Sequence, residues 1–158
     1  MSNPTLYGTA MSTYVRTARL ALEEKGVPYD MVDVNIFEEK NKEPEYIARH
    51  PFAKVPAFEH DGFALIEDGA IVRYVDNAFD GPALQPSDVK AQAEMDKWIS
   101  LYDSYIFPTM IGKLVWQRVV EPMLGGAPDE DIITGCLDEV ERQMGLIDAA
   151  LSAGGGWL

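Results

Sequence analysis

The sequence predicts a two-part protein, an α/β unit with the element order βαβαββα followed by an all-α helical unit. Strand-like and helix-like patterns alternate through the first half of the chain. Residues 81–88, with one glycine and two prolines, interrupt every periodicity and predict a linker. Beyond them, apolar residues recur only at helical steps of three and four. We therefore expect one domain at residues 1–80 and a second, partial domain at 89–158.

The first half begins with a strand–helix–strand pattern. A β-like run at 4–7 precedes a polar loop at 9–13, and a helix follows that Lys25-Gly26 closes with a helix-stop signal. Alternating residues at 29–34 predict the second strand. Two strands joined through a helix by short connections indicate parallel pairing and a right-handed crossover.

The rest of the first half is centred on a predicted hairpin. In chain order its elements are a charged loop at 35–43, a short helix at 45–49, a strand at 54–58, a turn at 60–62, a strand at 63–66 and a helix that starts at 67–69. Acidic residues suit that helix start, because its unpaired N–H groups and positive dipole end attract carboxylates.

The second half carries helical patterns alone. One pattern runs to about Val120, with Pro108 as a predicted kink or break. The other holds an apolar stripe that requires a partner helix. The stripe consists of Ile133, Leu137, Val140, Met144, Ile147 and Leu151. The chain ends on an apolar pair, Trp157-Leu158, and we interpret this ending as cut rather than completed.

Composition narrows the class of protein. Thirteen basic and 26 acidic residues give a net charge of −13, and no basic stripe is present, so nucleic acid or an anionic membrane surface is an unexpected partner. We find no apolar run of membrane-spanning length and no signal-peptide pattern. The single cysteine, Cys136, excludes an internal disulfide and a thiolate metal cluster. We expect a cytoplasmic protein with no metal.

The segment from Pro51 to Val75 suits an extended, peptide-like ligand. Proline lacks the N–H that a strand needs, so Val55-Pro56 has a special position at a strand start. A cis bond there would turn the backbone groups of Val55 towards a ligand, whereas an ordinary trans proline would explain the pattern equally well.

Glu67 and Asp68 stand at a predicted helix start. Either they cap the helix, or Glu67 accepts a hydrogen bond from a ligand ammonium while helix N–H groups bind an adjacent carboxylate. An α-amino acid carries both charges. Lys42 and Lys54 could meet a second carboxylate at the far end of such a ligand, although each is also typical of a solvated surface.

Several side chains could supply a hydroxyl or a base. Ser12, between a strand and a helix, is either an N-cap or a hydroxyl that donates to a ligand thiolate. Tyr7 and Tyr14 are further hydroxyl candidates. His50 and His60 stand beside loop residues, and we expect them to be surface or turn residues rather than bases.

Taken together, these residues resemble a glutathione transferase over essentially the whole chain, closest to the phi-like, serine-type group. The motifs are the Gly8…Ser12-Thr13 loop, Lys54-Val55-Pro56-Ala57, Glu67-Asp68-Gly69-Ala70-Ile71, and Lys113-Leu114-Val115-Trp116 with Pro122…Leu124-Gly125. The resemblance implies a thioredoxin-like N-terminal domain and an all-α C-terminal domain. It also implies a homodimeric detoxification enzyme that uses glutathione as co-substrate, without a further cofactor, against small hydrophobic electrophiles.

The resemblance also implies a role for each matching residue. Ser12 would hydrogen-bond the glutathione sulfur, and Val55 would pair its backbone with the cysteinyl moiety ahead of cis-Pro56. The other implied contacts are Asn41, Lys42 and Lys54 with the glycyl end, Glu67 and Asp68 with the γ-glutamyl end, and Met11, Phe37 and Trp116 with the apolar electrophile.

Two departures from the family pattern leave alternatives open. Asp68 stands where the family usually has serine, and an aspartate repels the γ-glutamyl carboxylate. Relatives also continue beyond the segment that matches Trp157-Leu158. The alternative function is a non-catalytic binding or scaffold module of the same fold. A thiol-disulfide enzyme would need a cysteine near the first helix, where Ser12 stands instead.

Overall fold

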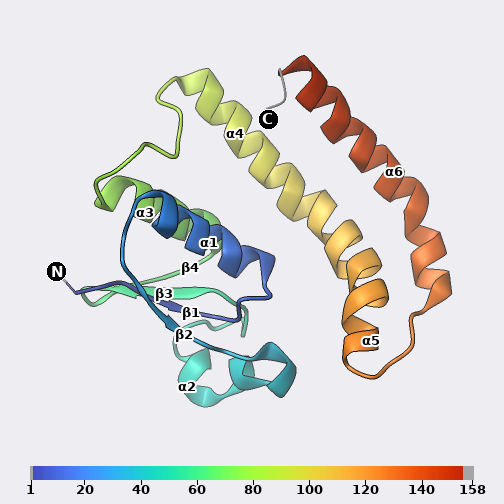
Figure 1. The fold of residues 1–158 in the computed structure, drawn as a ribbon, viewed down its shortest axis with the longest axis horizontal. Coiled ribbons are helices and arrows are strands. Elements are labelled where there is room, and N and C mark those ends of the chain that lie inside the picture. Colours follow the sequence, from blue (N-terminus) through green and yellow to red (C-terminus); the bar gives the residue numbers. More distant parts are fainter. Residues whose placement is uncertain (1, 155–158) are drawn as a thin grey trace. The chain divides into compact units, whose positions relative to one another are not determined.

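The computed structural model describes residues 2–154 of the chain (Figure 1). These residues form two compact units, one that runs to Pro86 and one that begins at Ser87. The predicted linker at 81–88 spans this division, and its exact bounds stay a prediction. Trp157 and Leu158, the apolar pair at the end of the chain, lie outside the described residues.

The first unit contains a four-stranded sheet and has the predicted order of strands and main helices. Its elements are β1 (Thr5–Tyr7), α1 (Thr13–Glu24), β2 (Asp30–Val32), η1 (Ile36–Glu38), η2 (Lys40–Lys42), α2 (Pro44–Ile47), β3 (Ala57–His60), β4 (Phe63–Ile66) and α3 (Asp68–Ala78). The strands lie in the order β2-β1-β3-β4. β1 pairs with β2 in parallel, as the predicted crossover requires, and the other two pairs are antiparallel.

Two local predictions need correction. The segment 35–43 is not a plain loop, because Asn35 accepts a hydrogen bond from the Phe37 N–H at 3.0 Å and starts η1, while Glu39 turns the chain at a φ of 59°. β3 begins at Ala57 rather than at Lys54, because Pro56 has no N–H with which to extend the ladder.

Both faces of the sheet are covered. α1 and α3 lie together on one face, and α2 lies on the other (Figure 1). The core under α1 and α3 is formed by Leu6, Val15, Ala18, Ala21, Leu22, Phe58, Ile71 and Val75. A smaller cluster on the opposite face contains Val34, Tyr46 and Ala57. Neighbouring strand residues thus point to opposite faces, as the pleat of a strand dictates.

A buried ion pair, which we call the Lys25–Asp76 cluster, joins α1 and α3 to residues 82–85. The Lys25 ammonium lies 3.1 Å from the Asp76 carboxylate and donates to the backbone carbonyls of Asp76 and Pro82 at 2.9 and 3.1 Å. The carboxylate also accepts hydrogen bonds from the Leu84 N–H and the Gln85 side chain. These hydrogen bonds, with the Leu84 N–H foremost, lower the pKa of Asp76.

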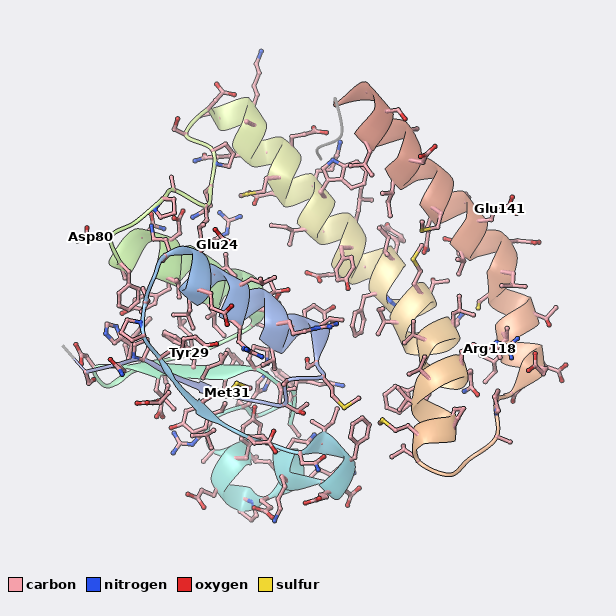
Figure 2. All side chains as sticks on the ribbon, in the orientation of Figure 1. Glu24, Tyr29, Met31, Asp80, Arg118 and Glu141 are labelled. Carbon is pink, nitrogen blue, oxygen red and sulfur yellow. The ribbon has the colours of Figure 1, made fainter. Side chains whose placement is uncertain are left out.

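The second unit is helical, with α4 (Val89–Leu101), η3 (Tyr102–Val120), α5 (Glu121–Met123) and α6 (Glu130–Ala153). η3 is a π-helix that continues through Pro108, so the helix does not break there, and the kink stays a prediction. Figure 2 shows Arg118 on η3 near the start of α6, where its guanidinium binds the Glu130 carboxylate at 2.6 and 3.0 Å.

α6 packs against η3 with a face that matches the predicted stripe only in part. Ile133 is buried and Val140, Ile147 and Leu151 are half-buried, as predicted. Leu137 and Met144 are instead 46% and 51% exposed, and Cys136 and Gln143 are buried in their place. Gln143 explains the change. Its side-chain amide donates to the Tyr105 carbonyl at 3.1 Å, so this face of the helix has to turn inward. In residues 2–154, no helix is long and apolar enough to cross a membrane.

Candidate functional site

One edge of the first unit's sheet gathers the predicted site residues. The β1–β3 ladder ends at Tyr7 and Ala57, and the β3–β4 ladder ends at Ala57 and Ile66. One step further in these antiparallel registers, Pro56 comes level with Gly8 on one side and with Glu67 on the other. The end of β1, the start of β3 and the end of β4 therefore meet at this sheet edge.

Gly8 allows the close approach of chain segments at this edge. A Cβ atom at position 8 would lie 3.4 Å from the Val55 Cβ and only 2.5 Å from a Val15 methyl carbon on α1. Since real Cβ atoms do not come that close, a larger residue would push α1 away from the sheet. The glycine keeps the first turn of α1, which Ser12 precedes, next to Val55.

Ser12 is the N-cap of α1, as its position between strand and helix suggests. Its Oγ atom accepts a hydrogen bond from the Val15 N–H at 3.4 Å. Capping uses a lone pair of the oxygen, and a serine hydroxyl also carries one donor hydrogen. The two roles considered for Ser12 are therefore compatible, because the oxygen can cap the helix while the hydrogen donates to a thiolate.

The Val55-Pro56 peptide bond is cis, so the trans alternative is wrong. Pro56 is buried, and Val55 is half-buried. Val55 precedes the first ladder position of β3 by two residues, so its backbone lies beyond the described β1–β3 and β3–β4 pairings.

Glu67 has an unusual backbone conformation, with φ 69° and ψ 116°. A residue other than glycine in this region is strained, and such strain concentrates at functional sites. Its carbonyl accepts the Ile71 N–H at 3.0 Å, but its side chain makes no capping hydrogen bond. The capping alternative is therefore wrong for the Glu67 carboxylate, and Asp68 follows as the first residue of α3.

The residues predicted to face the glycyl end have contacts within the protein. The Asn41 amide donates to the Ala53 carbonyl at 2.7 Å, and its Oδ1 is buried with no partner in the described chain. The Lys42 ammonium binds the Glu39 carboxylate at 2.5 Å, and both side chains are exposed. The roles of Asn41, Lys42 and Lys54 towards a ligand stay predictions. What the structure adds is that Asn41 holds the Ala53 backbone.

The Tyr7 hydroxyl is hydrogen-bonded within the sheet and does not belong to the predicted site. The hydroxyl donates to the Glu59 carboxylate at 2.8 Å, Arg49 pairs with the same carboxylate, and the Arg49 guanidinium lies 4.4 Å from the centre of the Tyr7 ring. Burial, followed by the hydrogen bond to Glu59, raises the pKa of Tyr7. Ser12 and Tyr14 remain as hydroxyl candidates at the start of α1.

Both histidines adjoin turns, as one of the expected alternatives has it, but the surface alternative is wrong for both. His50 is 2% and His60 6% exposed. His60 forms a hydrogen bond with the Tyr74 hydroxyl through Nδ1 at 2.8 Å. Sequence reasoning missed that His50 packs behind the site, together with Tyr46. The signal was the apolar Tyr46-Ile47 pair within an otherwise polar short helix.

The electrophile pocket predicted from Met11, Phe37 and Trp116 stays a prediction. Met11 is exposed and Phe37 half-buried in the first unit, while Trp116 belongs to the second unit and donates through Nε1 to Glu121 at 2.9 Å. Within the described residues, no group of three or more His, Cys, Asp or Glu side chains could hold a metal ion.

The mixed sheet, its flanking helices, the cis-proline before β3 and the helical second unit define a thioredoxin-like protein with an appended all-α part. The family described as "Glutathione S-transferase, N-terminal domain" matches residues 2–77. A probable glutathione S-transferase GSTF2 of Oryza sativa subsp. japonica is 30% identical over 93% of this chain and 68% of its own length.

Solved structures agree with these sequence comparisons. Glutathione transferase F7 from Populus trichocarpa has a TM-score of 0.84 at 30% identity, covering 95% of this chain and 71% of its own. Glutathione S-transferase-I bound with lactoylglutathione has a TM-score of 0.82 at 28% identity, covering 96% and 72%. The chain belongs to the glutathione transferase family, and the plant relatives confirm the phi-like resemblance.

Proposed function

We propose that this glutathione transferase binds glutathione along the sheet edge and directs its thiolate at small apolar electrophiles. One observation carries the assignment of the site: Ser12, Val55 and Glu67 come from three separate segments and converge where β1 ends, β3 starts and β4 ends. A tripeptide can span such an edge with its sulfur near α1 and its amino end near α3.

Ser12 has the task of keeping the sulfur ionised. A free cysteine-type thiol with a pKa of about 8.5 is only about 3% thiolate at pH 7. Lowering that pKa by roughly two units requires about 2.7 kcal/mol of differential stabilisation. One charge-assisted hydrogen bond contributes about 1.5–3 kcal/mol, and the α1 dipole adds to it. The thiolate then attacks the electrophile directly, without a covalent enzyme intermediate.

The remaining contacts orient the tripeptide. The Val55 backbone pairs with the cysteinyl moiety, because it stands beyond the end of the strand ladder. Glu67 accepts from the γ-glutamyl ammonium, and the first N–H groups of α3 bind the neighbouring carboxylate. Asp68 can assist only the ammonium. Lys42 and Lys54 face the glycyl carboxylate.

The decisive test measures the pKa of the bound glutathione thiol from its thiolate absorbance. In Ser12→Ala we expect the pKa to rise by about two units, towards the free value of about 8.5. Ser12→Thr retains a hydroxyl and a helix cap, so it should keep most of the depression. An unchanged pKa in Ser12→Ala would remove Ser12 from the mechanism.

Ser100→Ala is the matched control, because Ser100 is an exposed serine on α4 in the second unit. It should leave the pKa of the bound thiol unaltered. Calorimetric titration of the parent with glutathione separates the enzyme from the alternative, a binding or scaffold module. Absence of binding at millimolar glutathione would favour the scaffold function. That alternative is considered because Asp68 repels the γ-glutamyl carboxylate.

The proposal includes a cytoplasmic homodimer that needs no cofactor besides its co-substrate. Phe52 and Phe63 are exposed apolar side chains on the first unit and support a subunit contact there. Sedimentation velocity should give a mass of about twice that of the single chain at micromolar concentration. A monomer at all concentrations would contradict this part of the proposal.

A further inference from the structure

His50 is a buried histidine without a role in the proposed reaction. It is 2% exposed, and its Nδ1 atom is buried without a hydrogen bond of ordinary geometry in the part of the chain that the structure describes. Buried polar side-chain atoms are nearly always paired, and an exception calls for an explanation. Two charged residues of the glutathione site, Glu67 and Lys54, lie close enough to act on this ring.

The residues around His50 hold the turn that leads into Val55. The Ala53 N–H donates to the His50 carbonyl at 2.9 Å, and the Tyr46 hydroxyl donates to the Lys54 carbonyl at 2.7 Å. The imidazole stacks on the Tyr46 ring, with centroids 6.5 Å apart and planes at 19°. A displacement of the His50 ring would therefore move the backbone that presents Val55.

Charges on both sides act on the imidazole. Burial is the main influence and lowers the pKa of His50, so the neutral ring is the form present at neutral pH. The Glu67 carboxylate at the start of α3 and the backbone carbonyl of His50 itself favour the protonated form, and the Lys54 ammonium opposes it. Tyr46, which faces the ring from α2, stays neutral because burial raises its pKa to about 12.

We propose that His50 is a positioning residue of the glutathione site: its neutral ring holds the turn at residues 50–54 in the binding conformation, and protonation of the ring weakens glutathione binding. This inference rests on the proposed function. An imidazolium at this place would bury a positive charge and an N–H at Nδ1 without a well-formed hydrogen bond, because the His50 carbonyl favours the proton but does not meet hydrogen-bond geometry. It can be relieved only if the ring moves towards water, and the turn moves with it.

The bound ligand should act in the opposite direction. The γ-glutamyl ammonium placed at Glu67 offsets the carboxylate that favours protonation of His50. The glycyl carboxylate placed at Lys54 offsets the weaker, opposing influence of the Lys54 ammonium, so the net effect of the ligand is to disfavour protonation. By linkage, protonation of His50 must weaken glutathione binding by the same factor by which glutathione makes His50 harder to protonate. Affinity and the titration of the ring are therefore two independent readouts of one coupling.

S-hexylglutathione is a suitable probe, because its thioether has no proton to lose. We expect its calorimetric Kd to be constant above about pH 6.5, the ordinary pKa of histidine, and to rise at lower pH, by up to about tenfold per pH unit below the lowered pKa of His50. His50→Asn, whose amide does not titrate, should give a flat profile. His60→Asn is the matched control, since His60 is also buried but ends β3 at the far side from Pro56. It should retain the pH dependence of the parent.

A second measurement uses the parent protein and does not depend on the folding of His50→Asn. The chain has two histidines, so the ring signals of His50 in an NMR titration follow by comparison with His60→Asn. Saturation with S-hexylglutathione should lower the titration midpoint of His50. An unshifted midpoint at saturation, or binding with a flat pH profile in the parent, would overturn the role of His50 alone. Absence of binding at about pH 7.5 would overturn the glutathione site itself, and this inference with it.

Discussion

The Lys25–Asp76 cluster and the sheet-edge site lie in the same unit but treat their polar groups differently. In the cluster, the Lys25 ammonium has three oxygen partners, and the Asp76 carboxylate is bound by donors on both oxygens. At the sheet edge, the Glu67 side chain makes no capping bond, and buried atoms of Asn41 and His50 have no partner within the described chain. The cluster is complete without a ligand, whereas the site retains hydrogen-bonding capacity.

Backbone strain follows the same division. Four residues other than glycine have positive φ in the described chain: Glu39, Ala53, Asp61 and Glu67. Asp61 belongs to the β3–β4 turn, where such a conformation is common, but Glu67 and Ala53 adjoin the sheet edge. This difference is what we expect if the Lys25–Asp76 cluster serves stability and the sheet edge is the proposed binding site. Substitutions in the two regions should therefore affect different observables.

The largest expected effect is on stability, in Lys25→Met. Removal of the ammonium leaves the Asp76 carboxylate buried and without its cation, which costs about 3–5 kcal/mol of unfolding free energy. Urea denaturation measures this loss. Lys40→Met is the matched control, because the Lys40–Glu43 pair is half exposed and solvent-screened, so its loss should change stability little. Equal losses in the two variants would remove the distinction between the cluster and an ordinary surface pair.

Glu67→Gln should show the reverse pattern. Loss of the charge-assisted bond to the ligand ammonium should weaken glutathione binding by about ten- to a hundredfold. Stability should change by less than about 0.5 kcal/mol, because the side chain caps nothing. Calorimetry and urea denaturation of the same sample give both values.

Glu59→Gln is the control for this variant. Glu59 binds Tyr7 and Arg49 on the sheet, so its replacement should lower stability and leave glutathione affinity unchanged. If Glu67→Gln lost stability but kept its affinity for glutathione, the carboxylate would be structural and the contrast between the two regions would fail.

The smallest effect is expected for Asp68→Ser. A hydroxyl in place of the carboxylate removes repulsion of the γ-glutamyl carboxylate and adds a donor, so glutathione affinity should rise by about three- to tenfold. Asp80→Ser makes the same change of charge at an exposed residue and should alter affinity little. An affinity lower in Asp68→Ser than in the parent would show that Asp68 itself binds the ligand.

Much of the fold was predictable from local patterns. The apolar spacing of α1 and α3, and the alternation within β3 and β4, arise from residues near one another in sequence. The start of β3 and the two short turns near Asn35 were not predicted, because they depend on the missing N–H of Pro56 and on one side-chain cap. The buried face of α6 also differed in part, since Gln143 binds a carbonyl 38 positions earlier.

The residues of the candidate site also divide into those that local sequence patterns predicted and those that they did not. Ser12, Val55-Pro56 and Glu67 were identifiable because each belongs to a short motif with its own chemistry. The hydrogen bond from Asn41 to Ala53 and the burial of His50 were not, since both depend on the turn at residues 50–54, which is held by hydrogen bonds from α2 and η2. The apolar Tyr46-Ile47 pair was the one sequence signal near His50, and it does not by itself show that a histidine followed by proline is buried.

The sequence by itself therefore determined the order of the elements, the two-part organisation and the glutathione transferase resemblance, and it predicted the principal ligand contacts. Those features depend on residue type and on spacing along the chain. Only the tertiary structure decided that the Glu67 side chain does not cap α3, that Tyr7 is engaged by Glu59 and that His50 lies buried beside the site. The physical reason is that burial and hydrogen-bond partners are set by residues distant in sequence, whereas periodicity and motifs are local.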